Sequence, residues 1–132
     1  MYLIGFDPGR DKCGIALVTD KKQVLLHEVV TAANALPRLQ QLRTQYVITQ
    51  IVLGDQTSSK QWQQALQTQF PDLPIIQVDE RYSSLEARDR YWQYYPPRGL
   101  QQLVPTGMRT PPRPIDDLVA IILVERFLSQ PA

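Results

Sequence analysis

The hydrophobic and polar positions in the first quarter of the chain predict three consecutive strands. Apolar runs of strand length occupy residues 2–7, 13–19 and 23–30, and short polar segments with turn residues separate them. His27 alternates with apolar neighbours in the third run, and we expect it to be a solvated strand residue. Consecutive strands joined by short turns pair antiparallel, so we expect a meander with the first strand inside the sheet.

The rest of the chain alternates between helical and strand patterns. Apolar residues recur at helical spacing in four segments, and two short apolar runs of strand length lie between them. Strands that alternate with helices form parallel pairs. Together with the meander they predict an α/β fold with a mixed five-stranded sheet and helices on both faces. The predicted helices are residues 34–46, 58–70, 83–94 and 115–128, and the two further strands are residues 47–53 and 75–78.

A proline-rich segment interrupts this pattern before the last helix. Residues 95–114 hold six prolines and two glycines, which predicts an irregular, mobile loop. The helix before it, residues 83–94, begins with serines and has Glu86 at the spacing of a capping box. The chain shows no internal repeat and no linker, so we expect residues 1–132 to form a single domain.

Arginine is concentrated in one part of the chain, although the net charge is only +1. Residues 81–113 carry six arginines, no lysine and two acidic residues, a local net charge of +4. Such a segment suits the phosphate backbone of a nucleic acid, and a solvated helix face and loop is the simpler alternative. The single cysteine, Cys13, excludes an internal disulfide and a cysteine-based zinc site. No apolar run reaches about 18 residues, so we expect a cytoplasmic protein without a membrane span.

Acidic residues end or begin three of the predicted elements. Asp7 ends the first strand, Asp79 and Glu80 follow the last strand, and Asp116 and Asp117 open the buried last helix. In α/β sheets, sites form at the carboxyl ends of strands, so all three segments can reach one edge of the sheet. Carboxylates gathered there repel one another and favour a hard cation, which indicates Mg²⁺ or Mn²⁺ and the chemistry of phosphodiester cleavage.

Each of these acids also has a plain structural interpretation. Asp7 precedes Pro-Gly and suits a turn, and Glu80 precedes Arg81 and suits a surface ion pair. Asp116 or Asp117 suits the N-cap of a helix, where the positive end of the helix dipole favours a carboxylate. Sequence spacing alone leaves both interpretations of each residue open.

At these acidic positions the chain resembles a known family, the YqgF-type proteins, which are RNase H-like relatives of the RuvC Holliday-junction resolvases. Residues 7–16 match its opening Asp-x-Gly and Gly-[Val/Ile]-Ala motif, and residues 79–87 match its Asp-Glu-Arg and Glu-Ala motif. Residues 115–123 match its closing Asp-x-x-x-Ala motif before an apolar helix. Residues 52–54 resemble the family's middle strand, which ends in glycine. The similarity spans essentially the whole chain.

The resemblance implies an RNase H-like fold in which Asp7, Glu80 and Asp116 form a catalytic acidic triad that binds Mg²⁺ or Mn²⁺. It implies Asp117 as the alternative third ligand. It also implies a nuclease that acts on precursor 16S ribosomal RNA or on Holliday-junction-type branched DNA, as a monomer or a homodimer. The chain departs from the family at several positions, and at one of them Asp55 adds a fourth carboxylate near the strand ends.

Basic residues in and around these motifs are candidates for contacts with nucleic acid. Two of them lie beside the acids, where they contact a phosphate or simply offset the acidic cluster. The others belong to the proline-rich loop. The aromatic residues within 91–95 either stack on unpaired bases or pack against the core or a partner. The nucleic-acid-binding candidates are Lys12, Arg81, Arg98, Arg109 and Arg113.

Three other functions compete with a metal-dependent nuclease. A non-catalytic nucleic-acid-binding module would keep the fold without turnover. A small dimeric scaffold would use the aromatic residues within 91–95 as its contact surface. An actin-like ATPase also begins with Asp-x-Gly after a strand, but that class needs two domains and several hundred residues, far more than the 132 of this chain.

Overall fold

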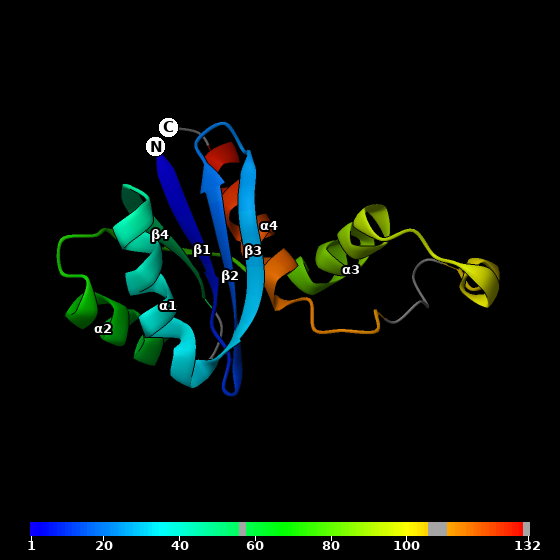
Figure 1. Cartoon of the computed structure of the whole chain (residues 1–132), viewed down its shortest axis with the longest axis horizontal. Coiled ribbons are helices and arrows are strands. Elements are labelled where there is room, and N and C mark those ends of the chain that lie inside the picture. The colour runs from blue at the N-terminus through cyan, green and yellow to red at the C-terminus, as the bar shows by residue number, and fades with distance from the viewer. Residues whose placement is uncertain (56–57, 106–110, 131–132) are drawn as a thin grey trace.

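A five-stranded mixed sheet forms the centre of the computed structural model, which describes residues 1–55, 58–105 and 111–130 (Figure 1). The strand order is β3-β2-β1-β4-β5, and helices cover both faces of the sheet, as the sequence predicts. The strands are β1 (Tyr2–Asp7), β2 (Lys12–Thr19), β3 (Val24–Thr31), β4 (Ile48–Gly54) and β5 (Ile75–Val78). The helices are α1 (Ala32–Gln45), α2 (Ser59–Gln69), α3 (Ser83–Tyr94), the 3₁₀ helix η1 (Gly99–Leu103) and α4 (Asp116–Ser129).

The central position of β1 determines where the carboxyl ends of the strands meet. β1 pairs antiparallel with β2, where Asp7 lies opposite Gly14, and parallel with β4, where Phe6 lies opposite Leu53. β4 in turn pairs parallel with β5, with Gly54 opposite Val78. The chain therefore leaves β1, β4 and β5 at the same edge of the sheet.

Alternation of side chains along β1 divides the core into two layers. Leu3 belongs to the layer under α3 and α4, and Ile4 and Phe6 belong to the layer under α1 and α2. α4 is the most buried helix, since every residue from Asp117 to Val124 is buried. This confirms the prediction that the apolar last helix is a core element. In Figure 1, α3 and η1 extend away from the sheet, whereas α4 lies against it.

The structure corrects two predictions about the segment from α3 to α4. The loop predicted to be irregular contains η1, a short 3₁₀ helix at Gly99–Leu103. The capping box at the start of α3 is also wrong, because the helix has no side-chain cap and Glu86 pairs with Arg126 instead. The part of the predicted loop at residues 106–110, with Arg109, lies outside the described residues.

Within the described part of the chain, none of the helices combines the length and the apolar character that crossing a membrane requires. The longest helices, α1 and α4, have 14 residues each. A membrane-spanning helix needs about 20 residues.

Candidate active site at the carboxyl ends of the strands

Two acids predicted from the sequence meet where β1 ends and α4 begins. Asp7 is the last residue of β1 and Asp116 is the first residue of α4. The side chains of Asp7 and Asp116 interact, which raises the pKa of Asp7 and acts to lower that of Asp116, and the charge of Glu80 also raises the pKa of Asp7. The fold therefore brings Asp7 and Asp116 into contact and places Glu80 near them.

Gly14 makes the contact between Asp7 and Asp116 possible. Gly14 lies opposite Asp7 on the neighbouring strand, and a Cβ atom at this position would lie only 1.9 Å from the backbone oxygen of Asp116. Any side chain here would push the first turn of α4 away from the sheet. The glycine in the opening motif is thus explained by the close approach of α4.

Gly54, the last residue of β4, leaves room for the side chain of Glu80 in the same way. An added Cβ atom would lie 1.4 Å from Oε1 of Glu80, so the carboxylate occupies the space that a side chain would fill. Glu80 is only 3% exposed, and its Oε1 has no hydrogen-bond partner among the residues that the structure describes. A buried carboxylate oxygen without a partner is costly, and it marks a position suited to a cation.

Gly54→Ala is expected to displace the Glu80 carboxylate while preserving the fold. The added methyl group meets the movable end of a side chain, because its three nearest atoms all belong to the side chain of Glu80. Misplacement of a catalytic group by about 1 Å can reduce the rate about 100-fold. Cleavage rates and thermal unfolding of the wild type and the variant measure both effects. A fully active, folded variant would remove Glu80 from the site.

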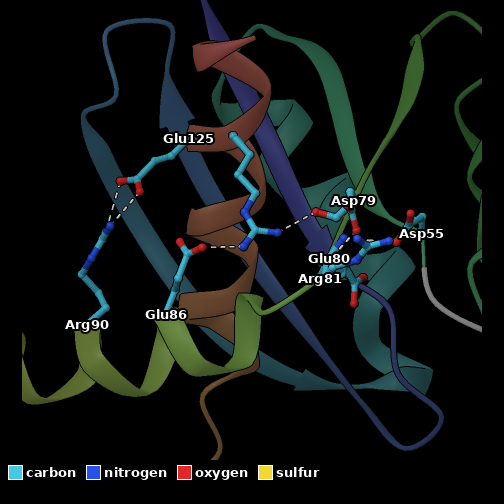
Figure 2. Close-up of polar contacts among 8 residues, drawn as sticks. Asp55, Asp79, Glu80, Arg81, Glu86, Arg90 and Glu125 are labelled. Carbon is cyan, nitrogen blue, oxygen red and sulfur yellow. Dashed lines mark hydrogen bonds and ion pairs between the residues drawn. The ribbon is translucent and has the colours of Figure 1, made fainter. Parts of the chain in front are cut away.

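The turn after β5 holds Glu80 in place through its backbone (Figure 2). Asp55 Oδ1 accepts a hydrogen bond of 3.1 Å from the backbone nitrogen of Glu80, and Asp79 Oδ1 accepts one of 2.8 Å from that of Arg81. Tyr82 follows with a left-handed backbone (φ 61°), which is strained for a residue with a side chain. This conformation reverses the chain between β5 and α3 and leaves Glu80 at the strand ends.

Arg126 ties this turn to the two helices that cover it. Its Nη1 donates to the backbone oxygen of Asp79 at 2.7 Å, and its Nη2 donates to Oε1 of Glu86 at 2.5 Å. A second ion pair, Arg90 with Glu125, joins α3 to α4 through two hydrogen bonds of 2.7 and 3.1 Å (Figure 2). Arg126 is not among the site residues predicted from the sequence. The available signal was a lone arginine in a helix that is otherwise predicted to be buried.

Asp117, the alternative third ligand, lies in a different set of contacts from Asp116. Its Oδ2 is 2.7 Å from Nδ1 of His27, and its Oδ1 accepts hydrogen bonds from Arg113 Nη1 at 3.1 Å and from the backbone nitrogen of Leu118 at 3.0 Å. Its side chain is only 3% exposed. His27 lies on a strand, as predicted, but its side chain is only 24% exposed and pairs with Asp117, so the prediction that it is solvated is wrong. No local feature of the sequence indicates this contact, because the two residues are 90 positions apart.

Burial and mutual repulsion raise the pKa values of the clustered carboxyls. The pKa of Asp7 rises to about 8, chiefly through burial and then through the charges of Glu80 and Asp116. The pKa of Glu80 rises to about 7, again chiefly through burial and then through the charge of Asp55. Burial also raises the pKa of Asp116. A bound cation would reverse each of these shifts, because it favours the charged form of every carboxyl.

The donor atoms fit a hard divalent ion. The cluster offers carboxylate oxygens, which suit Mg²⁺ or Mn²⁺, and one buried oxygen of Glu80 finds no partner in the described part of the chain. Among the residues that the structure describes, no three acidic, histidine or cysteine side chains are already arranged as a ligand set. The charges of Glu80 and Asp116 both act on Asp7, and the charge of Asp55 acts on Glu80. An ion held among these carboxyls would complete the site.

The predicted nucleic-acid contacts fall into two classes. Lys12, Arg81 and Arg98 are exposed, and Lys12 lies close enough to Asp116 to lower the pKa of that carboxyl. Arg113 is half-buried and binds Asp117, so its charge is used within the protein. Arg109 is outside the described residues.

The aromatic residues at the end of α3 also fall into two classes, one buried and one exposed. Tyr91 and Trp92 are buried in the core, 7% and 8% exposed. Tyr94 and Tyr95 remain exposed at 42% and 47%. The guanidinium carbon of Arg113 lies 5.6 Å from the ring centre of Tyr91 and 5.7 Å from that of Tyr95. Packing within the protein therefore accounts for most of this cluster.

Comparison with known proteins agrees with this architecture. The model of a family described as RuvX, Holliday junction resolvase, matches residues 1–130. Thermus thermophilus RuvC in complex with a Holliday junction substrate is 16% identical, with a TM-score of 0.59 over 96% of this chain and 93% of that one. A second T. thermophilus RuvC structure is 15% identical, with a TM-score of 0.53 over 96% of this chain and 94% of that one.

Other matches are more distant. No curated protein sequence matches the chain. The chain spans only 40% of a Cytophaga hutchinsonii protein described as a sugar kinase and 30% of a ROK family transcriptional regulator, each 12% identical with a TM-score of 0.48. The RuvC structures confirm the predicted RNase H-like α/β fold. Because the family model covers nearly the whole sequence, the chain belongs to the RuvX family of Holliday junction resolvases, the YqgF-type relatives of RuvC that its motifs resemble.

Proposed function

We propose that the protein is a divalent-metal-dependent endonuclease that hydrolyses phosphodiester bonds in branched DNA. One observation carries the proposal. Asp7 interacts with two carboxyls from distant parts of the chain, Glu80 and Asp116, and Glu80 holds a buried oxygen that has no partner among the described residues. Folding brings mutually repelling acids together at a cost, which is expected where they hold a cation.

Asp7, Glu80 and Asp116 would hold Mg²⁺ or Mn²⁺. Such an ion supplies Lewis-acid stabilisation of the negative charge that develops at the phosphate and at the leaving oxygen. Lys12 and Arg81 are exposed next to these acids, where each can bind a phosphate oxygen of the backbone. Asp55 and Arg126 act on the site indirectly, because they hold the turn that carries Glu80.

The choice of branched DNA rests on the comparisons. The matching family is described as a Holliday junction resolvase, and the similar RuvC structure is a complex with a Holliday junction substrate. Precursor 16S ribosomal RNA is the second substrate class that the sequence motifs imply. A direct comparison of the two substrates decides between them.

The test is cleavage of a labelled four-way DNA junction, a linear duplex of the same sequence and a folded precursor rRNA fragment, with and without Mn²⁺. We expect Mn²⁺-dependent cleavage of the junction by the wild type and its loss in Glu80→Gln. Asp20→Asn is the matched control, because it removes an exposed carboxylate in the turn between β2 and β3. Cleavage of the rRNA fragment but not of the junction would show that the substrate is RNA and not branched DNA. Junction binding without cleavage under any condition would indicate a binding module.

A further inference from the structure

A cavity lies beside the edge of the sheet at which β1, β4 and β5 end, and it is lined by residues that directly follow Asp7 in the chain. It has a volume of about 870 Å³ and is bounded by the turn at Pro8, Gly9 and Arg10, by Leu36 of α1 and by Gln61 and Trp62 of α2. Pockets of about 300–1,000 Å³ are typical of small-ligand sites. The acidic cluster meets α4 on one face of the sheet, and this cavity opens on the α1 and α2 face of the same edge.

The wall of the cavity is well supported. The indole nitrogen of Trp62 donates a hydrogen bond of 3.2 Å to the backbone oxygen of Gly9. The ring of Trp62 lies 5.1 Å from that of Phe6, at an angle of 52°. Gly9 is itself required, since a Cβ atom there would lie 1.9 Å from the backbone oxygen of Lys12. Trp62 therefore holds the turn that follows Asp7 while it lines the cavity.

The chemistry of the lining favours a nucleobase. Trp62 offers an aromatic surface and Leu36 an apolar one, which suit the flat faces of a base. Gln61 offers an amide that donates and accepts hydrogen bonds, as base edges require. Among the described lining residues Arg10 alone is charged, and its positive charge suits the adjoining phosphate.

The position of the cavity next to Asp7 indicates which strand would supply the base. Only Pro8 and Gly9 separate Asp7 from Arg10, so a strand with a phosphate at the carboxylates can reach the cavity. We infer that the cavity receives an unpaired nucleobase of the strand bound at the carboxylates, stacked against Trp62 with its edge on Gln61. This inference rests on the proposed nuclease function, because it needs a nucleic acid at the carboxylates.

The test compares binding of a short oligothymidylate with binding of an abasic backbone of the same length, in EDTA so that cleavage plays no part. The abasic strand keeps the phosphates and lacks the bases. Because stacking on an aromatic side chain contributes about 1–3 kcal/mol per base, the wild type should prefer the oligothymidylate by roughly 5- to 150-fold. Gln61→Ala and Trp62→Leu should each reduce this preference, and Gln61→Ala should leave the affinity for the abasic strand nearly unchanged.

Gln64→Ala is the matched control, because Gln64 is exposed on α2 and does not line the cavity. Thermal unfolding shows whether Trp62→Leu is folded, and Gln61→Ala tests the same cavity from an exposed position. Equal affinity of the wild type for the two strands would overturn the inference, as would a preference that survives both substitutions. Junction cleavage by a protein that shows no preference for the oligothymidylate would overturn the proposed role of the cavity and leave the nuclease proposal standing. A base preference in a protein that does not cleave the junction would support the cavity and reject the nuclease, and binding to neither strand together with no junction cleavage would reject both.

Discussion

Asp7→Asn is expected to abolish cleavage and, in the absence of divalent cations, to make the protein more stable. Removal of a group that stabilises the transition state at a catalytic centre costs about 10²- to 10³-fold in rate. The gain in stability has a separate cause. Asp7 is partly buried and lies close to the charges of Glu80 and Asp116, so its own charge is unfavourable, and an uncharged amide of the same shape removes both the cost of burial and the repulsion. A merely structural Asp7 in a Pro-Gly turn predicts the opposite, a loss of stability with no specific loss of cleavage.

The pH dependence of stability follows from the pKa of about 8 for Asp7 in the folded protein. An unfolded aspartate titrates near pH 3.9, so between about pH 4 and pH 8 the folded state binds more protons than the unfolded state. Stability then falls as the pH rises through this window. Each pKa unit corresponds to about 1.4 kcal/mol, and we expect Asp7→Asn to recover at least that amount at pH 7.5.

Chemical denaturation at pH 5 and pH 7.5, with EDTA and with Mg²⁺, measures this effect. The wild type should gain stability from Mg²⁺ at pH 7.5, and Asp7→Asn should gain much less. Asp20→Asn, which changes an exposed carboxylate far from the cluster, should follow the wild type throughout. A wild type whose stability is independent of both pH and Mg²⁺ would contradict the crowded carboxylate cluster.

Local sequence patterns were enough to predict the elements and the edge at which the acids gather. The apolar run that ends at Asp7 is a strand because alternate residues face two different cores, Leu3 one and Ile4 the other. Parallel pairing then brings the end of β5 to the same edge as the end of β1. These conclusions depend on short-range periodicity and on general rules of sheet topology, which a single sequence contains.

The contacts that orient the side chains could not be predicted in the same way. Asp117 binds His27 across 90 positions, and Arg126 reaches the backbone of Asp79 across 47. No local pattern marks such partners. Glu86 shows the consequence, because its spacing suits a capping box whereas the tertiary contact with Arg126 takes the carboxylate away from the helix terminus. Local preference yields here to a charged partner supplied by a distant helix.

Asp116→Asn and Asp117→Asn are expected to separate catalysis from stability at neighbouring positions. Successive residues of an α-helix point about 100° apart, and the two carboxylates accordingly bind different partners. Asp116 interacts with Asp7 where β1 ends and α4 begins, whereas Asp117 contacts His27 and Arg113. Asp116→Asn should therefore lose cleavage by about 10³-fold and remain at least as stable as the wild type in EDTA.

Asp117→Asn should show the reverse behaviour. A buried carboxylate that accepts hydrogen bonds from Arg113 and from the backbone of Leu118 contributes to folding, and its loss should cost about 1–3 kcal/mol. The folded fraction should still cleave the junction at nearly the wild-type rate. Denaturant unfolding and single-turnover cleavage, measured on the same preparations, distinguish the two variants. Loss of cleavage in a fully stable Asp117→Asn would move the third ligand to Asp117, because a carboxylate that only supports the fold cannot produce that result.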